Sequence, residues 1–192
     1  MEENHYQRSF GKQDLGQHNF ARDEYEHCTF KECDFSNTDL SNCRFSDCTF
    51  TDCNLSLAKL KKTALQNIQF KNCKMLGLHF HLANPFGLSL SFTGCTLNHA
   101  SFFGLKLKGI AFKNCRLAEA DFSNADLSQS LFENCDLSDA TFENTNLTKA
   151  DLRTSFNYLI DPATNLIKDA HFSLSQIAGL LYRYHIKIDR GA

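Results

Sequence analysis

The thiols are the first candidates for chemistry in this sequence, because cysteines recur in it at intervals of 20 residues. Two series have this spacing, namely Cys33, Cys53 and Cys73, and Cys95, Cys115 and Cys135. If one interval is one coil of the chain, the thiols of a series stack about 4.8 Å apart, close enough for a metal site, a redox pair or a disulfide. However, the chain has no CxxC pair, and no histidine recurs beside either series. We therefore predict reduced, buried thiols that pack as small hydrophobic groups.

The remaining reactive residues do not form a recognisable catalytic pattern. The eight histidines are scattered without ligand or general-base spacing, at His5, His18, His27, His79, His81, His99, His171 and His185. There is no glycine-rich phosphate loop, no nucleophile motif and no identifiable pair of catalytic carboxylates. The sequence therefore predicts a protein that is not an enzyme and that has no cofactor and no metal.

Composition and the ends of the chain narrow the cellular setting. The formal net charge is −2, so no global charge indicates direct binding to nucleic acid or to a membrane. The first ten residues are polar and do not resemble a signal peptide, and no run approaches the roughly 18 apolar residues of a membrane span. An odd number of cysteines, nine, also argues against a secreted disulfide framework. We therefore expect a cytoplasmic protein.

An apolar residue occupies every fifth position over most of the chain. We call these residues the centres, and they run from Phe10 to Phe80 and then, two residues out of step, from Phe92 to Leu152. In the second run every centre is Phe or Leu. A second position, two residues before each centre, holds mostly small residues from Cys28 onward, and all nine cysteines fall on it. This regularity identifies a tandem five-residue repeat.

A period of five matches neither a helix nor a strand. A chain that buries two residues in every five must turn once per repeat, and four such sides close a square coil of 20 residues. The centres then fill the middle, and the small residues fit the wall, where bulk would clash at interior packing density. The sequence thus predicts an all-β solenoid, a four-sided β-helix of about seven coils stacked at strand spacing.

The repeats resemble those of the pentapeptide-repeat family, whose motif is often written A(D/N)LXX. The best matches are Ala120-Asp121-Phe122-Ser123-Asn124, Ala125-Asp126-Leu127 and Ala150-Asp151-Leu152. The resemblance implies that the quadrilateral β-helix is right-handed. The period and the two inward positions follow from the residues alone.

The pattern divides the chain into five segments: an N-terminal cap with an imperfect first coil (1–26), a first repeat run (27–80), a break (81–91), a second run (92–153) and a C-terminal segment (154–192). The break contains Pro85 and Phe86 and is either a bulge or corner loop, or a surface loop that presents Phe86 to a partner.

In the C-terminal segment Ser173 and Gln176 resemble a capping box, which predicts a short α-helix followed by an extended stretch over 185–188. This helix could cap the last coil and also form a homodimer contact. The expected contact residues are Leu174, Ile177, Leu180, Leu181 and Tyr184.

Charge is uneven along the chain. Residues 116–151 are strongly acidic, whereas lysines cluster between Lys59 and Lys74. The acids lie at outward repeat positions, where local pairing in a solvated surface is the alternative to a partner-binding role. The candidate partner-binding acids are Glu119, Asp121, Asp126, Glu133, Asp136, Asp139 and Glu143.

Some stretches are similar to one branch of the family, the Qnr-like and albicidin- or microcin-resistance proteins that act on DNA gyrase. They are Cys53 to Leu57, Cys73 to Gly77, Ser91 to Leu105 and the end from Phe172 to Ile188. This resemblance implies a dimeric rod, similar to duplex DNA in width and charge, that binds DNA gyrase or topoisomerase IV and protects it from a quinolone or an albicidin-like toxin. The alternative is a scaffold that binds another protein and has no gyrase activity. The chain is only mildly acidic and has no long insertion, so we expect any mimicry to depend on residues 116–151 and on the dimer centre.

Overall fold

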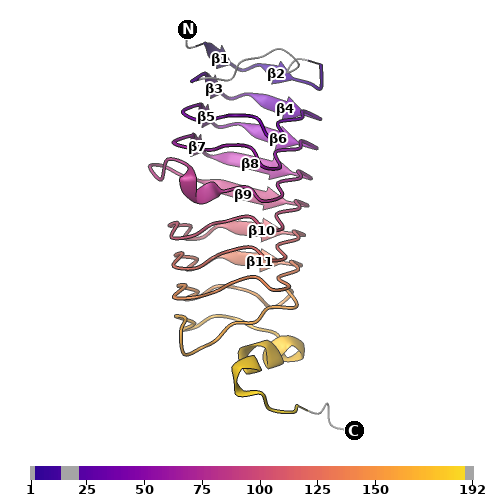
Figure 1. The fold of residues 1–192 in the computed structure, drawn as a ribbon, viewed down its shortest axis with the longest axis vertical. Coiled ribbons are helices and arrows are strands. Elements are labelled where there is room, and N and C mark those ends of the chain that lie inside the picture. Colours follow the sequence, from indigo (N-terminus) through magenta and orange to yellow (C-terminus); the bar gives the residue numbers. More distant parts are fainter. Residues whose placement is uncertain (1–2, 14–21, 189–192) are drawn as a thin grey trace.

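The chain winds into one long rod of stacked coils (Figure 1). The computed structural model describes residues 3–13 and 22–188, so the expected centres Leu15 and Phe20 lie outside the described residues. The strands are β1 (Asn4–Tyr6), β2 (Ser9–Phe10), β3 (Glu24–Glu26), β4 (Thr29–Lys31), β5 (Arg44–Ser46), β6 (Thr49–Thr51), β7 (Ala64–Gln66), β8 (Ile68–Lys71), β9 (Leu90–Thr93), β10 (Ala111–Lys113) and β11 (Leu131–Glu133). The helical segments are of the 3₁₀ type: η1 (Phe80–Leu82), η2 (Leu174–Leu180) and η3 (Tyr182–Tyr184).

The strands form two parallel sheets along the rod. One sheet has the order β1-β3-β5-β7, and the other has the order β11-β10-β9-β8-β6-β4-β2. Paired residues are 20 apart in the chain, as Phe30 and Phe50 are, except across the break, where Phe70 pairs with Phe92. Seven strands stacked on one side correspond to six full turns between the first and the last. The predicted solenoid and its period are therefore confirmed.

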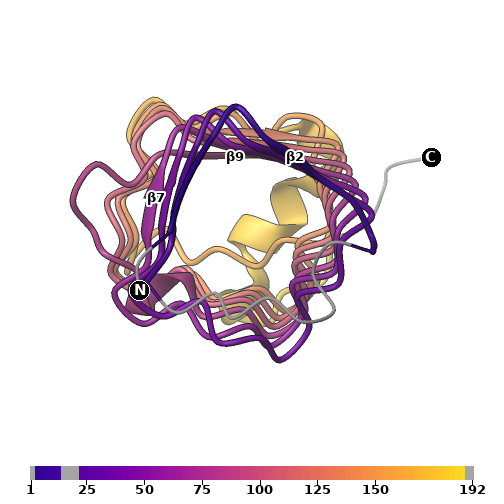
Figure 2. The same ribbon diagram turned by 90° about the horizontal axis from the view of Figure 1, so that it is seen from above.

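Each coil has four sides and is right-handed. Seen from the N-terminal end, the chain passes clockwise from β7 to the sheet that carries β2 and β9 as it recedes (Figure 2). We number the sides by their centres: side 1 is the seven-stranded sheet with Phe30 and Phe132, side 2 holds Phe35 and Leu137, side 3 holds Leu40 and Phe142, and side 4 holds Tyr25 and Leu147.

The centres fill the interior and stack on one another. All described centres are buried, each with no more than 6% of its surface exposed. On side 1 a continuous stack of phenylalanine rings runs from Phe10 to Phe132, with centroid distances of 4.6 to 5.3 Å. Rings on opposite sides meet edge to face across the interior, as Phe112 on side 1 and Phe122 on side 3 do at 5.9 Å. Offset-stacked and edge-to-face pairs both suit the aromatic quadrupole, so this arrangement explains why phenylalanine dominates the repeat.

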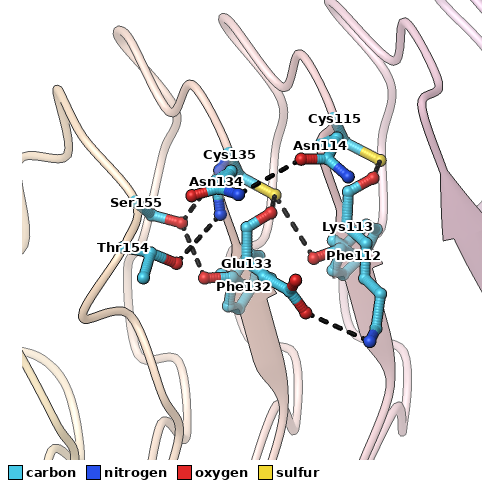
Figure 3. A network of polar contacts seen from close by, with 10 residues as sticks. All are labelled: Phe112, Lys113, Asn114, Cys115, Phe132, Glu133, Asn134, Cys135, Thr154 and Ser155. Carbon is cyan, nitrogen blue, oxygen red and sulfur yellow. Dashed lines mark hydrogen bonds and ion pairs between the residues drawn. The ribbon is translucent and has the colours of Figure 1, made fainter.

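The wall residues, which lie two positions before each centre, pack in the interior and also form hydrogen bonds. Cys135 Sγ donates to the carbonyl oxygen of Phe112 at 3.4 Å, and Ser155 Oγ donates to that of Phe132 at 2.8 Å (Figure 3). Thr63 and Thr145 make the same bond one coil back, to Leu40 and Phe122. A wall residue thus has to be small and gains from a donor, which Cys, Ser and Thr all provide.

The corners explain how the chain turns so often with only nine glycines. The residue two after most centres has a positive φ, for example 57° at Asn37 and 54° at Asp139. Asn and Asp tolerate this left-handed conformation better than other side chains do. Polar residues therefore supply most of the corners.

The break takes up its two extra residues without disturbing the stack. η1 ends at Leu82, Ala83 is buried, and residues 84–88 then bulge from side 4 before β9 resumes the sheet. The rings of Phe70 and Phe92, on either side of the break, still stack at 5.3 Å. The insertion is therefore confined to one side of one coil.

At the N-terminus the coil is better built than its sequence suggests. His5 occupies a centre and stacks on Tyr25 at 4.7 Å, and the wall position holds a buried Asp23. The Asp23 carboxylate accepts hydrogen bonds from the Tyr25 hydroxyl and from the backbone N–H of Glu3. Both polar residues are tolerated because they are hydrogen-bonded within the terminal coil.

The coil also continues beyond the end of the apolar repeat. Ser155 and Asn165 occupy wall positions, and backbone bridges join Asn146 to Leu166 and Asp151 to His171. Tyr158 and Ile160 are buried, although neither lies in the register of the earlier centres. The backbone ladder thus maintains the winding where the sequence period has already ended.

The C-terminal helix lies where it was expected, but it is 3₁₀-wound rather than α-helical. Its bonds span three residues, such as Leu181 N–H to the Ala178 carbonyl. The Gly179 carbonyl accepts instead from the Ile160 N–H at 3.0 Å, so the last coil binds a group that an α-helix would use itself.

The expected capping box is also absent from the described C-terminal residues, and the predicted extended stretch does not begin at His185. The Ser173 side chain caps no N–H, whereas Gln176 Oε1 accepts a hydrogen bond from the backbone of Asn157. His185 is left-handed, with a φ of 50°, rather than extended. In both cases, contacts and turns of the cap replace the local pattern that the sequence predicted.

Candidate interaction surfaces

The two cysteine series form one column of thiols on the side 2 wall. The two residues inserted at the break align Cys73 with Cys95, because Lys74 bridges to Thr96. Each of these six thiols donates to a backbone carbonyl, as Cys53 does to Phe30 at 3.4 Å and to Thr51 at 3.3 Å. All nine cysteines are reduced thiols, and all nine are buried. Since a thiolate is the reactive form, buried donor thiols are poor nucleophiles and poor ligands.

Burial also alters thiol acidity elsewhere on the wall. It raises the pKa of Cys43 to about 11 and that of Cys48 to about 12. Within the described residues, no group of three His, Cys, Asp or Glu side chains is arranged to hold a metal ion. We interpret the cysteines as wall residues rather than as a functional site.

The seven candidate acids lie on all four sides of the rod. Glu133 lies on side 1, Asp136 on side 2 and Asp126 on side 4. Glu119 and Asp139 follow one another along the corner between sides 2 and 3, Asp121 lies next to that corner on side 3, and Glu143 lies at the opposite edge of side 3, in the turn to side 4. The structure thus places four of the seven on side 3 or at its border with side 2, and we call these four (Glu119, Asp121, Asp139 and Glu143) the acidic corner.

In the described part of the chain, the three acids outside the acidic corner have a lysine or arginine neighbour, whereas the four acids of the acidic corner do not. Glu133 is 3.1 Å from Lys113 in the coil above (Figure 3), and Asp136 and Asp126 are register neighbours of Arg116 and Lys106. Glu119 has His99 near it, at 3.3 Å. Among the described residues, Asp121, Asp139 and Glu143 have no cationic side chain within ion-pair distance. The acidic corner is therefore the part of the acidic half whose charge is least compensated.

The aspartates that precede a centre also have a structural role. Asp121 Oδ1 accepts a hydrogen bond from the Ser123 N–H at 3.0 Å, and Asp126 and Asp136 do the same at Ser128 and Ser138. Asn54 and Asn146 make the identical bond in other coils. An Asp-to-Asn change at these positions therefore removes the charge and retains the turn.

The middle of the rod contains no acid at all. From Cys53 to Ala118 the sequence has no Asp and no Glu, but it has nine Lys and Arg residues. We call this stretch the carboxylate-free belt. Its described surface also exposes four large apolar side chains, namely Leu57, Leu82, Phe86 and Phe103.

A groove in this belt lies on side 3, N-terminal to the acidic corner in the stack, and the coil that carries His99 and Ser101 separates the two. It has a volume of about 330 Å³ and is lined by Leu57, Gly77 and Leu82, with Lys59 and Lys61 at its rim. Sequence reasoning missed it. The available signal was a leucine two residues after a centre, at Leu57 and again at Leu82, because polar residues or glycine occupy this position elsewhere in the repeat.

Phe86 lies in the loop on side 4 rather than in the groove. It is 80% exposed, and its N–H is held by Asn84 Oδ1 at 3.0 Å. Pro85 is exposed beside it. The structure thus shows a surface loop with an ordered turn, and a role in partner binding remains a proposal.

The C-terminal end exposes much apolar surface. Of the five expected contact residues, Leu174, Ile177 and Tyr184 are exposed, Leu181 is partly buried, and Leu180 is buried in the core. Tyr182, Ile186 and Ile188 add to the exposed surface. Leu180 therefore caps the last coil, and the other residues remain available for a dimer contact. No described helix has the length and apolar character needed to cross a bilayer.

Comparisons with known proteins agree with this geometry. A model of the pentapeptide repeat region matches residues 24–102 and 88–152. Among solved structures, full-length QnrB1, a plasmid-mediated fluoroquinolone resistance protein, is 20% identical with a TM-score of 0.50, over 95% of this chain and 100% of that one. HetL, a pentapeptide repeat protein involved in heterocyst differentiation regulation in the cyanobacterium Nostoc, is 18% identical with a TM-score of 0.34, over 89% and 84% of the two chains. No curated protein is significantly similar in sequence.

Proposed function

Because the chain belongs to the pentapeptide-repeat family, we propose that it is a DNA-mimicking rod that binds a type II topoisomerase and protects it from a poison. The enzyme would be DNA gyrase or topoisomerase IV, and the poison a quinolone or an albicidin-like toxin. The overlap with the resistance protein QnrB1 extends over nearly the whole of both chains and supports this choice among the roles of such rods.

The acidic corner is the observation that carries the proposal. Glu119 and Asp139 are one coil apart, about 4.8 Å, with Asp121 next to them and Glu143 at the other edge of side 3. Partly or wholly uncompensated carboxylates on a rigid rod present a line of negative charge, as a phosphate backbone does. A surface built to bind duplex DNA attracts such a line, and the attraction weakens as salt rises.

The C-terminal end extends the same surface if two copies meet there. The exposed Leu174, Ile177 and Tyr184 would pair across a two-fold axis, and each acidic corner would lie on its own side of the joint. The rod then acts by occupancy. It competes with DNA for the saddle of the enzyme and disfavours the poisoned complex, and none of its own groups reacts.

Supercoiling by purified gyrase tests the proposal directly. Relaxed plasmid is incubated with gyrase, with or without ciprofloxacin or albicidin, while the concentration of this protein is increased. We expect supercoiling to recover in the presence of the drug. A protein that neither rescues nor inhibits supercoiling at high concentration would exclude topoisomerase protection.

Charge variants then locate the surface. The combined variant Glu119→Gln, Asp121→Asn, Asp139→Asn and Glu143→Gln removes four charges, and the new amide in place of the Asp121 carboxylate can still accept the turn bond from Ser123. A matched control removes four exposed charges from the first run, through Asp34→Asn, Asp39→Asn, Asp47→Asn and Asp52→Asn. We expect rescue to weaken at least tenfold in the first variant only. Equal loss, or no loss, in the two variants would contradict mimicry by the acidic corner.

The second candidate function is a scaffold that binds another protein and has no gyrase activity. The carboxylate-free belt favours it, because a net positive middle fits poorly in a surface that binds phosphates. Failure of the supercoiling test together with dimerisation through the C-terminus would support the scaffold.

A further inference from the structure

Leu57 is the residue that the repeat itself does not explain. It lies on the corner between sides 2 and 3 with a φ of 59°, and it is the only aliphatic residue among the described non-glycine positions of positive φ. A left-handed backbone disfavours leucine, and here 58% of the residue surface is also exposed. Neither the backbone conformation nor the burial of the side chain favours leucine at this position. A residue held in an unfavourable backbone conformation without a packing reason points to a functional surface.

The neighbours of Leu57 make a groove rather than a flat face. The next corner residue is Gly77, where an added Cβ would approach Leu57 Cδ2 to 2.9 Å. The absence of a side chain at Gly77 therefore leaves the floor open. Leu82 lies on the other wall with 47% exposure, held by the bond from the Lys62 N–H to its carbonyl. The volume of about 330 Å³ is at the lower end of ligand-sized pockets, roughly 300–1,000 Å³.

The charge around this groove is positive. Lys59 and Lys61 line its rim and Lys62 follows on the same side, whereas a single described acid, Asp39, lines it. His79 lines the C-terminal side of the groove and lies 5.3 Å from His81, whose ring meets Phe103 edge to face at 6.5 Å. The apolar groove is thus continuous with an exposed aromatic strip and bordered by lysines.

We propose that this groove binds an acidic segment of a partner protein, which inserts one large apolar side chain between Leu57 and Leu82. The lysines would pair with carboxylates on both sides of that anchor, and Phe103 would cover its C-terminal flank. A central apolar anchor with a charged rim is the usual anatomy of a small protein interface.

A protein segment fits this surface better than a nucleic acid does. Leu57 and Leu82, which flank the space for the anchor, are aliphatic, and aliphatic side chains provide no platform on which a base can stack. Binding of a phosphate backbone would use the lysines alone and leave Leu57 without a role. The proposal goes beyond topoisomerase protection and does not depend on it, since it concerns a different part of side 3.

Two labelled peptides test the proposal by fluorescence anisotropy on the full chain. One is a nonapeptide with a single leucine between acidic residues, and the other has serine in place of the leucine. We expect the leucine peptide to bind at least ten times more tightly, because burying one leucine corresponds to about that factor. A short duplex DNA serves as the competing probe. Equal binding of the two peptides, or stronger competition by DNA than by the unlabelled leucine peptide, would overturn the proposal.

Variants of the groove complete the test. Leu57→Asn introduces the residue type that most often occupies such corners in this chain, so the fold should be retained. Gly77→Asn keeps a tolerated left-handed residue and fills the floor. We expect either change to abolish the preference for the leucine peptide, while Leu166→Asn, an exposed leucine of the last coil, leaves it unchanged. Unaltered preference in Leu57→Asn, with thermal unfolding intact, would refute the assigned groove.

A random peptide library provides a second readout that does not assume a peptide sequence. The library is selected on the wild-type protein, and sequences that also bind Leu57→Asn are removed. The surviving peptides should combine acidic residues with a large apolar residue. A selection that yields basic or purely polar peptides would contradict the proposal.

Discussion

The two repeat runs share one interior but have opposite surfaces. Along a single corner, between sides 2 and 3, the residues change from Leu57 and Gly77 in the first run to Glu119 and Asp139 in the second. Beneath them the side 2 centres remain apolar and the wall is a continuous column of cysteines. The same backbone thus presents a groove bordered by lysines in one half and uncompensated carboxylates in the other.

This contrast shows which positions of the repeat are free to vary. Two residues in five point inward and are constrained by packing and by the hydrogen bond from the wall to the preceding coil. The other three are constrained only where a turn needs a left-handed residue or an Asx acceptor. Function in such a rod therefore lies in the outward positions, and its two halves can serve different partners.

The largest expected effect on stability tests whether the interiors of the two repeat runs are equivalent. Phe50→Asp in the first run and Phe122→Asp in the second each place an unpaired charge inside a ring stack. We expect each to lower the free energy of unfolding by more than about 4 kcal/mol and to melt several coils, measured by circular dichroism in urea. Asn124→Asp, which adds the same charge at an exposed corner, is the control. A folded, soluble variant at either position would show that its run is packed differently.

The cap should be more sensitive than a repeat corner to one added methyl group. A Cβ at Gly179 would clash with the Tyr158 carbonyl oxygen, whereas a Cβ at Gly104 has no atom within 4 Å and meets only a positive φ of 66°. We expect Gly179→Ala to destabilise by about 2–3 kcal/mol and to release the 3₁₀ segment, and Gly104→Ala to cost about 1 kcal/mol. Thermal unfolding and limited proteolysis at the C-terminus measure both. Equal effects would mean that the cap does not pack as closely as described.

A smaller change in stability is expected when residues are exchanged along the corner between sides 2 and 3, which the two runs share. Leu57→Asn should stabilise the chain by about 0.5–1 kcal/mol, because asparagine tolerates the left-handed backbone and little burial is lost. The reverse change one coil earlier, Asn37→Leu, should destabilise it by a similar amount. Urea midpoints of the two variants measure this, and a destabilised Leu57→Asn would show that the leucine serves folding.

The smallest effect concerns acid stability, which the two runs should share. Hydrogen bonds from Ser41 lower the pKa of Asp39, and the hydrogen bond and charge of Arg153 lower that of Asp151. A carboxylate with a lowered folded pKa contributes stability that is fully present above its unfolded value, near 4, and is lost as the pH falls through the folded value. Asp39→Asn should reduce this acid sensitivity slightly and leave stability at neutral pH nearly unchanged. Urea titrations at several pH values between about 2 and 7 measure it, and unchanged acid sensitivity would show that the turn bond does not favour the charged form.

The repeat, its inward positions and the solenoid were all readable from the sequence. Burying two residues in every five is a local rule, so the centres from Phe30 to Leu152 and the wall cysteines could be identified without any long-range information. The donor role of the wall was not visible, because the accepting carbonyl belongs to the preceding coil. The capping box at Ser173 failed for a similar reason, since Gln176 binds the last coil instead.

The sequence alone defines the period, and with it the side of the coil to which each residue belongs. Tertiary stacking decided which outward residues become neighbours, because residues that meet on the surface are 20 or 22 positions apart. It placed four of the seven candidate acids on or beside side 3, joined two cysteine series into one column and opened a groove between Leu57 and Leu82. It also maintained the winding past Leu152, because the backbone ladder of one coil orders the next even where the apolar centres have ended.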